Sequence, residues 1–367
     1  MTVGTIVIGA GPAGLATSRE LKRRGLSHVV LERGNRPGYT WAHLYDSLVL
    51  HTGKHLSSLP GLRFADSVPL FPSRLQFLDY LLRYTATFDL PVTTGADVET
   101  VARIDGAWCV RTRAGQELRA KAVVVATGIA SNPVMPAIPN RDSFTGRVRH
   151  SIEYKNASGT LGHRMLVVGA GNSAGEIAAE LSRAGARITL AVRNGATVVP
   201  REVLGIPLQY VAIPFGYLPR AIQRGAAAFV ARASALSRRK PVLPAPALSN
   251  CSRVPLIGFH LADEIRRGAI QIKGGVSAFT TAGVRFADGS AGDFDDVIFA
   301  TGFRAAMGMC GDAVRRDSCG FGLRRKRVVG VDQSDLYFVG HNPDIRGALF
   351  TIARDARRVA GMIRRSQ

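Results

Sequence analysis

The sequence predicts an α/β protein with two dinucleotide-binding (Rossmann-like) domains, one of which is inserted into the other. Two observations predict this fold. A short apolar strand, a glycine-rich turn and an amphipathic helix follow one another twice along the chain, and two further apolar strands each end in Ala-Thr-Gly. The length of 367 residues suits two domains at roughly 150 residues each.

The first glycine-rich turn lies between the apolar run Thr5–Ile8 and a helical pattern from Leu15 to Arg24, and it reads Gly9-Ala10-Gly11-Pro12-Ala13-Gly14. In such a turn the first glycine permits a sharp bend, the second lets a pyrophosphate approach the backbone, and the third lets helix and strand pack closely. The phosphates are then held by N–H groups at the helix N-terminus. A tight turn without a ligand is the simpler alternative, but the position between strand and helix favours dinucleotide binding.

The second turn has the same context. It follows the apolar run Met165–Val168, precedes a helical pattern from Gly175 to Arg183, and reads Gly169-Ala170-Gly171-Asn172-Ser173-Ala174. Alanine at the third position is still small enough for close packing of helix and strand. The repeat therefore predicts a second dinucleotide site.

The residues that end the next strands distinguish the two ligands. The strand after the first turn ends at Glu32, 21 residues beyond Gly11; a carboxylate there accepts hydrogen bonds from ribose hydroxyls and repels a 2′-phosphate. The strand after the second turn ends at Arg193, 22 residues beyond Gly171, and a guanidinium suits a 2′-phosphate. The first site is therefore predicted to bind FAD and the second NADPH, with an ordinary surface charge as the alternative for Arg193.

The two strands that end in Ala-Thr-Gly are Ala122–Gly128 and Val297–Gly302. Each follows a region of short strands and turns, so each is expected to return the chain to a parallel sheet. We expect a discontinuous FAD-binding domain of residues 1–157 and 291–367, with an NADPH-binding domain of residues 158–290 inserted between its parts.

Residues 144–154 match the signature F-x-G-x-x-x-H-x-x-x-F/Y at every fixed position, through Phe144, Gly146, His150 and Tyr154. On these residues and the two glycine turns, the chain resembles the flavin-containing monooxygenases (class B flavoprotein monooxygenases). Baeyer–Villiger relatives usually end the signature in Trp, so Tyr154 favours the monooxygenase branch.

Further segments resemble the YUCCA-type branch, which oxidatively decarboxylates indole-3-pyruvate. The resemblance covers nearly the whole chain and is weakest at 205–250. The segments that carry it are Trp41–His51, Phe71–Arg74, Phe77–Tyr80, Gly171–Ser173, Ala300–Arg304, Leu336–Gly340 and the helical pattern Leu349–Ile363.

This resemblance implies that NADPH reduces FAD, that NADP⁺ stays bound, and that O₂ adds to the reduced flavin as a C4a-(hydro)peroxyflavin. One oxygen atom is then inserted into a small organic substrate. A carbonyl or 2-oxo acid is favoured over N- or S-oxidation of amines or sulfides, and both substrate classes stay open.

The resemblance and the turns together give the expected site. The residues expected to contact FAD are Gly9, Gly11, Pro12, Ala13, Gly14, Glu32, Arg33, Trp41, Thr127, Gly128 and Gly340. Those expected to contact NADPH are Gly169, Gly171, Asn172, Ser173, Ala174, Arg193, Thr301 and Gly302. The catalytic candidates around the flavin are His51, Asn172 and Ser173.

Two histidines have competing interpretations. The YUCCA type carries a histidine where many flavin-containing monooxygenases carry an asparagine, so His51 is expected beside the flavin ring. A structural histidine at a strand end is the alternative. For His150 a hinge or packing role is favoured over proton transfer.

The charge balance is unusual, with 48 Lys and Arg against 27 Asp and Glu and a net charge of +21. The basic residues are spread along the chain without a nucleic-acid-binding motif, so we expect no nucleic-acid partner and a solvated arginine-rich surface. Weak steering of anionic ligands or membranes stays open, and residues 207–240 are the segment that could touch a membrane, although an amphipathic helix packed on its own core is commoner. The expected partners are a small-molecule substrate and O₂; the sequence leaves the oligomeric state open.

The four cysteines are scattered, without a C-x-x-C pair. Neither a dithiol redox centre nor a metal site is therefore expected. With no signal peptide or apolar run long enough to span a bilayer, the expected location is cytoplasmic. The alternative functions are a flavoprotein reductase or oxidase that passes NADPH electrons to a quinone, a protein or O₂, and a flavin-fold protein retained for binding; the intact turns weigh against the latter.

Overall fold

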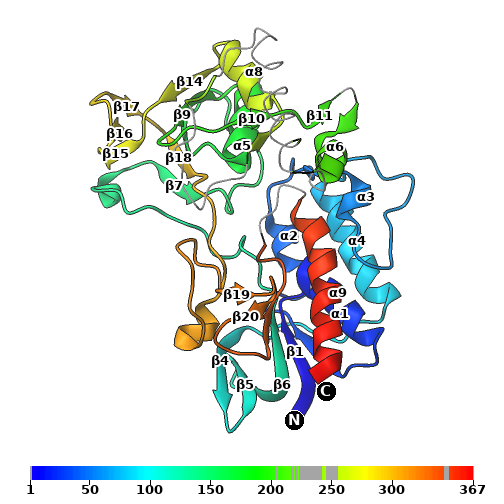
Figure 1. Cartoon of the computed structure of the whole chain (residues 1–367). Coiled ribbons are helices and arrows are strands. Elements are labelled where there is room, and N and C mark those ends of the chain that lie inside the picture. The colour runs from blue at the N-terminus through cyan, green and yellow to red at the C-terminus, as the bar shows by residue number, and fades with distance from the viewer. Residues whose placement is uncertain are drawn as a thin grey trace. The chain divides into compact units, whose positions relative to one another are not determined.

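A computed structural model describes residues 2–203, 205–215, 219, 222, 242–244, 255–342 and 347–366. The chain divides into two compact units, one formed by Met1–Pro133 with Phe303–Gln367 and the other by Val134–Gly302. The mixed α/β architecture with one unit inserted into the other confirms the predicted fold class (Figure 1). Each unit is described by itself.

The first unit is built on a sheet with the strand order β19-β20-β21-β6-β1-β2-β3. Strands β21, β6, β1, β2 and β3 pair in parallel. The central strand β1 is buried on both faces, because Ile6 and Val7 point to opposite sides of the sheet and both are fully buried. A continuous apolar run is what a parallel strand covered on both faces requires.

Helices cover one face of this sheet and a β-meander covers the other. On the Val7 face, α1 lies against α9 and near α4 (Figure 1). On the Ile6 face, Val101 of β4, Trp108 of β5 and Cys310 of the 3₁₀ helix η2 belong to a second cluster. The elements of this unit are β1 Thr2–Ile8, α1 Pro12–Lys22, β2 His28–Leu31, α2 Tyr39–His43, α3 Lys54–Ser57, α4 Arg74–Thr87, β3 Val92–Thr93, β4 Val98–Ile104, β5 Ala107–Thr112, β6 Glu117–Val125, η2 Gly308–Ala313, β19 Arg324–Arg325, β20 Val329–Gly330, β21 Leu336–Phe338 and α9 Ala348–Ser366.

The second unit has a five-stranded parallel sheet of order β14-β9-β8-β18-β7 and a three-stranded antiparallel sheet β15-β16-β17. Its core includes Leu166, Val284 and Phe299, each fully buried. The elements are η1 Arg141–Ser143, β7 Arg147–His150, β8 Arg164–Val168, α5 Asn172–Arg183, β9 Arg187–Ala191, β10 Val198–Val199, β11 Glu202–Val203, β12 Ile206–Pro207, α6 Leu208–Phe215, β13 Leu256–Ile257, α8 His260–Arg266, β14 Ile270–Lys273, β15 Val276–Phe279, β16 Gly283–Phe286, β17 Ala291–Asp293 and β18 Asp296–Phe299.

The boundaries between the units differ from the predicted ones. The prediction divided the chain at 157/158 and 290/291, whereas the two compact units meet at 133/134 and 302/303. The reason is strand pairing: β7 and β18 pair with each other, and β18 also pairs with β8, so both strands belong to the sheet of the second unit. The sequence pattern predicted the strand that is β18 but no strand at β7, and it did not predict the sheet that the two strands join.

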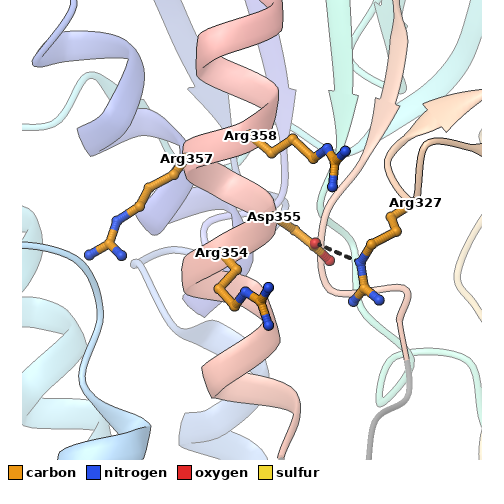
Figure 2. A pocket seen from close by; sticks show the side chains of 5 residues that line it. All are labelled: Arg327, Arg354, Asp355, Arg357 and Arg358. Atoms are coloured by element: carbon orange, nitrogen blue, oxygen red, sulfur yellow. Dashed lines mark ion pairs between the residues drawn. The ribbon is translucent and has the colours of Figure 1, made fainter. Parts of the chain in front are cut away.

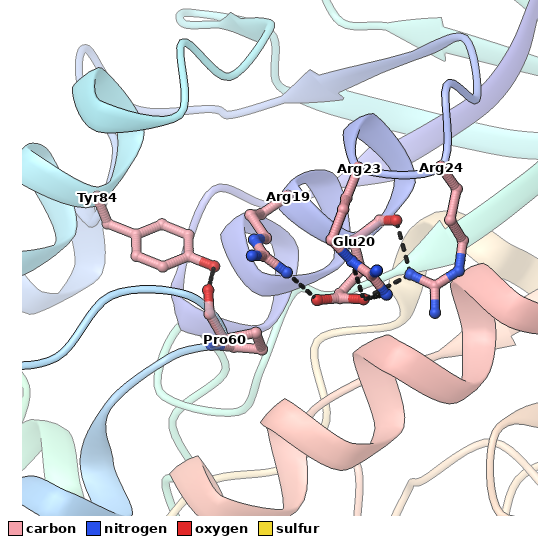
Figure 3. A network of polar contacts seen from close by, with 6 residues as sticks. All are labelled: Arg19, Glu20, Arg23, Arg24, Pro60 and Tyr84. Atoms are coloured by element: carbon pink, nitrogen blue, oxygen red, sulfur yellow. Dashed lines mark hydrogen bonds and ion pairs between the residues drawn. The ribbon is translucent and has the colours of Figure 1, made fainter.

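A buried carboxylate organises the end of α1. Glu20 is 1% exposed and accepts hydrogen bonds from Arg19, Arg23 and Arg24 (Figure 3). Burial by itself raises the pKa of Glu20, but hydrogen bonds from the three arginines outweigh it and the pKa is lowered. Glu20 therefore stays ionised and neutralises positive charge where α1 packs against α9.

A second buried contact in the same region fixes the loop before α4. The Tyr84 hydroxyl donates a 2.7 Å hydrogen bond to the Pro60 carbonyl (Figure 3). Tyr80 on the same helix donates to the carbonyl of Leu62. These bonds hold the segment that leads from the predicted flavin region into α4.

Of the predicted 207–240 segment, the structure describes 207–215, 219 and 222. The remaining residues of that segment lie outside the described residues, so the suggested membrane contact there stays a prediction. In the part of the chain that is described, no helix combines the length and apolar character needed to cross a membrane.

Candidate functional site

The first glycine turn connects β1 to α1, and protein atoms explain two of its glycines. Gly9 has φ +100°, and a Cβ there would lie 2.8 Å from the carbonyl oxygen of Ala126. A Cβ at Gly14 would lie 1.8 Å from the carbonyl oxygen of Gly9. Both glycines are therefore required for helix α1 to sit directly on the strand ends.

Gly11 is different. Its φ of −79° is accessible to any residue, and a Cβ built on it would meet no protein atom within 4 Å. No side chain caps the N-terminus of α1, which begins at Pro12, a residue that has no N–H. The structure thus leaves open space above Gly11, beside the uncapped first turn of a helix. These residues fit a pyrophosphate that lies on the backbone.

Glu32 lies immediately after β2 with a buried side chain. Its Oε2 accepts a 2.7 Å hydrogen bond from the N–H of Ala10, and its Oε1 accepts one of 2.9 Å from the N–H of Gly34. The carboxylate is therefore fixed against the glycine turn. Each oxygen retains a lone pair that can accept a ribose hydroxyl.

The second turn repeats this division of roles. Gly169 has φ +133°, and a Cβ there would lie 2.4 Å from the carbonyl oxygen of Ala300. Gly171 has φ −86°, caps α5 without a side-chain hydrogen bond, and would meet nothing within 4 Å if it carried a Cβ. Ala174 is fully buried beneath the turn. The second unit therefore has the same open space at a helix N-terminus.

Arg193 follows β9 and is exposed. A Cβ at Gly275 would lie 3.2 Å from the Cβ of Arg193, so a glycine at that position leaves room for the arginine. Arg193 occupies in its unit the strand-end position that Glu32 occupies in the other. The two residues have opposite charges, and Glu32 is buried whereas Arg193 is exposed.

Asn172 is committed to the protein backbone. Its Oδ1 accepts a 2.7 Å hydrogen bond from the N–H of Ile257, and its Nδ2 donates one of 3.3 Å to the carbonyl of Pro255. Asn172 therefore holds the β13 segment against the second turn. Ser173, the next residue, is half-buried in the first turn of α5.

His51 stands in the first unit at the entrance to α3, and it is half-buried. The neighbouring Leu50 donates from its N–H to the carbonyl of Pro72. On the other side, Thr52 approaches Gly347, which precedes α9: a Cβ on Gly347 would lie 2.7 Å from the Thr52 Cγ2. Thr52, the residue after His51, thus lies beside the N-terminal end of α9.

Gly340 belongs to the same region as the first glycine turn. It follows β21 with φ +83°, and a Cβ there would lie 3.1 Å from the Cβ of Ala13. The structure therefore brings Gly340 directly against α1. Of the remaining expected contacts, Arg33 is exposed and Trp41 packs edge-on against Phe77.

Sequence reasoning missed Arg74 as a residue of this site. Its side chain is 7% exposed, donates to the carbonyls of Trp41 and Ala42, and pairs with Asp46 at 2.8 Å. A signal was present, because Ser73 and Gln76 form a capping box that places Arg74 in the first position of α4. A cation is disfavoured at a helix N-terminus, so an arginine there indicates a specific contact.

The two Ala-Thr-Gly segments make equivalent hydrogen bonds in their two units. The Thr127 hydroxyl donates to the carbonyl of Ala306, and the Thr301 hydroxyl donates to the carbonyl of Val134. The glycines that follow, Gly128 and Gly302, have φ +64° and +87°. In each unit the threonine of the motif therefore ties the end of a sheet strand, β6 or β18, to the backbone of a residue outside the strands.

Of the fixed signature residues in 144–154, Phe144, His150 and Tyr154 are buried within the second unit and Gly146 is half-buried. The ring of Phe144 covers Gly146 so closely that a Cβ there would lie 2.3 Å from the ring. His150 is 1% exposed; its Nδ1 accepts from the N–H of Ile152, so its Nε2 donates to the carbonyl of Gly302. Burial lowers the pKa of His150, which is consistent with a neutral ring.

Tyr154 completes this arrangement. It is fully buried, and the Arg149 guanidinium, which pairs with Asp296 at 2.6 Å, lies over its ring. The signature therefore fixes β7 to β18 and to Gly302, the last residue of the unit. The residues of the signature therefore have a packing role within the second unit.

With this geometry in place, the comparisons with known proteins define the class. Residues 6–202 match the family model described as pyridine nucleotide-disulphide oxidoreductase, and the chain belongs to that family. Within it, the chain is a flavin-dependent monooxygenase similar to the YUCCA type. The cofactors of these enzymes are FAD and NADPH, as predicted.

Particular relatives support this assignment. The chain is 36% identical over 312 residues to the indole-3-pyruvate monooxygenase YUCCA1 of Oryza sativa subsp. japonica, covering 82% of this chain and 77% of that protein. It is 36% identical over 313 residues to the probable indole-3-pyruvate monooxygenase YUCCA1 of Arabidopsis thaliana, covering 82% and 76%. A variant of the flavin monooxygenase from Stenotrophomonas maltophilia has a TM-score of 0.80 and 25% identity, covering 100% of this chain and 99% of that structure.

The signature makes a specific prediction about stability. Gly146→Ala should lower the free energy of unfolding by about 1–3 kcal/mol, because the new methyl group meets the Phe144 ring and the Asp295 carbonyl oxygen. Urea unfolding followed by circular dichroism measures this change. Gly308→Ala is the matched control, since a Cβ there meets no protein atom within 4 Å. Equal stability of the two variants would contradict the packing role.

Proposed function

We propose that this enzyme uses NADPH and FAD to insert one oxygen atom from O₂ into a 2-oxo acid, with loss of the carboxyl group as CO₂. The observation that carries this proposal is the 36% identity over 82% of the chain to proteins named indole-3-pyruvate monooxygenase. The net charge of +21 adds a physical reason, because a positive field raises the encounter rate of a carboxylate substrate.

The proposed reaction balances in atoms and electrons. A 2-oxo acid R–CO–COO⁻, O₂, NADPH and H⁺ give R–COO⁻, CO₂, H₂O and NADP⁺. The bond between the two carbonyl carbons breaks, and one new C–O bond forms. NADPH supplies the two electrons that, with two protons, reduce the second oxygen atom to water.

The proposed FAD site lies in the first unit. The N–H groups of the first turn of α1 would hold the pyrophosphate over Gly11, and Glu32 would accept the ribose hydroxyls. Gly340 lies against Ala13, and because it has no side chain it places no atoms beyond its backbone beside this turn. Bound FAD supplies the redox chemistry and the activation of O₂.

The proposed NADPH site lies in the second unit. The uncapped first turn of α5 would hold the pyrophosphate over Gly171. Arg193 would pair with the 2′-phosphate through its planar fork of donors. Asn172 contributes by holding residues 255–257 in place, which supports a positioning role more than a chemical one.

His51 is the proposed polar group beside the flavin ring. Its place between the Leu50–Pro72 bond and the Thr52–Gly347 contact holds its backbone on both sides. A fixed side chain can hold a proton at one position without reorganisation during reaction. Arg74 holds the α2 carbonyls on the other side of the same chain segment.

The function is tested with ¹⁸O₂. Purified enzyme, NADPH and indole-3-pyruvate should release CO₂ and give a carboxylate that carries one labelled oxygen atom per NADPH oxidised. A thioether and a tertiary amine serve as alternative substrates. Label in the N- or S-oxide alone would overturn the 2-oxo acid assignment. NADPH oxidation that yields hydrogen peroxide and no labelled product would instead favour the reductase or oxidase reading.

The open space above the second glycine of each turn gives a paired prediction. Gly11→Ala should weaken FAD binding at least tenfold, and Gly171→Ala should do the same for NADPH while FAD is retained. Neither added methyl group meets a protein atom within 4 Å, so unfolding midpoints should stay close to that of the unaltered enzyme. Flavin fluorescence and equilibrium dialysis measure the two affinities. Retained binding in either variant would show that no ligand lies on that turn.

Arg193 sets the proposed preference for NADPH over NADH. Arg193→Ala should raise the KM for NADPH by roughly 10- to 100-fold, the range of a lost charge-assisted pair, and leave the KM for NADH nearly unchanged. Steady-state oxidation of both nucleotides measures the difference. Arg187→Ala, an exposed arginine at the opposite end of β9, is the control. An equal effect on both nucleotides would remove the 2′-phosphate assignment.

A further inference from the structure

A basic cavity lies on the first unit, beside the middle of α9. It has a volume of about 350 Å³ and is lined by Arg327, Arg354, Asp355, Arg357 and Arg358. Four of these come from the middle of α9 and one from the turn between β19 and β20 (Figure 2). The lining thus carries four positive charges and one negative charge.

The single carboxylate of the cavity is already engaged. Asp355 is 2% exposed; its Oδ2 accepts from Asn342 and its Oδ1 lies 3.5 Å from the Nε of Arg327. Asn342 also donates to the backbone carbonyl of Arg327. Asp355 therefore fixes the floor of the cavity and offsets at most the charge of Arg327.

The turn that presents Arg327 has an unusual backbone. Lys326 and Arg327 have φ +49° and +71°, in the left-handed region that residues with a Cβ rarely adopt. Such a conformation costs on the order of 1 kcal/mol per residue. The turn is held by the Asn342 and Asp355 contacts, which direct the Arg327 guanidinium onto the cavity floor.

The three α9 arginines that line the cavity have no carboxylate partner among the described residues. Arg354 rests over the Phe350 ring, and all three side chains are exposed. Like charges three and four residues apart on a helix repel each other, at about 0.2–0.5 kcal/mol per pair. Figure 2 shows Arg354 and Arg358 on the Arg327 side of α9, whereas Arg357 points to the other side.

The geometry points to a binding site for a phosphate-bearing anion, either free in solution or as a lipid headgroup, held by Arg354 and Arg358 with Arg327 at the floor. Guanidinium groups bind phosphate oxygens through paired N–H donors. A cavity of about 350 Å³ holds roughly a dozen water molecules, which is enough for one or two phosphate groups. A bound dianion would also remove the repulsion along α9. This inference is independent of the proposed function.

The test uses the FAD-loaded enzyme saturated with NADP⁺, so that both proposed nucleotide sites are occupied. Isothermal titration with sodium pyrophosphate at constant ionic strength should show saturable binding. The double substitution R354Q/R358Q should raise the Kd at least tenfold. R364Q/R365Q, on the same helix beyond the cavity, removes the same charge and should change the Kd less than twofold.

The source of the phosphate is resolved by a second arm. Sedimentation with phosphatidylglycerol–phosphatidylcholine vesicles, compared with pure phosphatidylcholine, tests a headgroup. Binding to pyrophosphate alone assigns a free phosphate, whereas vesicle binding that is lost in R354Q/R358Q and kept in R364Q/R365Q assigns a headgroup.

Two results would overturn the inference. One is the absence of saturable binding to either probe, and the other is equal weakening in R354Q/R358Q and R364Q/R365Q, which would reflect net charge only. The variant R354K/R358K separates the planar fork from the charge, because it keeps the charge and should still weaken pyrophosphate binding severalfold. Unfolding midpoints check that all variants fold.

Discussion

The close approach of helix to strand at two glycine turns is the constraint on which both units depend. Gly14 places α1 so near the strand end that a Cβ would overlap the Gly9 carbonyl, and Gly9 itself is pressed against Ala126 at the end of β6. Gly169 is pressed in the same way against Ala300 at the end of β18. The turn, the helix N-terminus and the end of the neighbouring strand therefore form one rigid element in each unit.

This constraint separates the glycines that protein contacts or backbone angles require from those that no protein contact explains. Gly9, Gly14 and Gly169 are surrounded by protein atoms or have left-handed backbones. Gly11 and Gly171 have ordinary backbone angles and empty space around them. In each unit, a glycine of this kind directly precedes the uncapped α-helix of the glycine turn, so the space at that helix N-terminus is open.

The sequence pattern was sufficient to predict features that depend on residues close together in the chain. The strand–turn–helix repeats, the helix of α9 and the opposite charges of Glu32 and Arg193 all follow from residues close together in the chain. The unit boundaries were not predictable in this way, because β7 and β18 are 146 residues or more apart in sequence and join one sheet only through pairing. The roles of Asn172, Arg74 and His150 could not be predicted for the same reason, because each of these residues bonds to a partner that is distant in the sequence. His150 could be assigned a packing role in advance, but its partner, the Gly302 carbonyl, could not.

The excess of positive charge has a structural consequence that composition alone does not give. With 48 basic and 27 acidic residues, 21 positive charges are not balanced by a negative charge. Many arginines are nevertheless used locally, as with Arg149 on Asp296 and the three arginines on Glu20. Helix α9 differs because its one acidic residue, Asp355, faces inward and is held by Arg327 and Asn342. Part of the unbalanced charge therefore lies on consecutive turns of this helix, whose N-terminal end lies beside Thr52. An anion bound there would thus act on the same helix that borders the proposed flavin region.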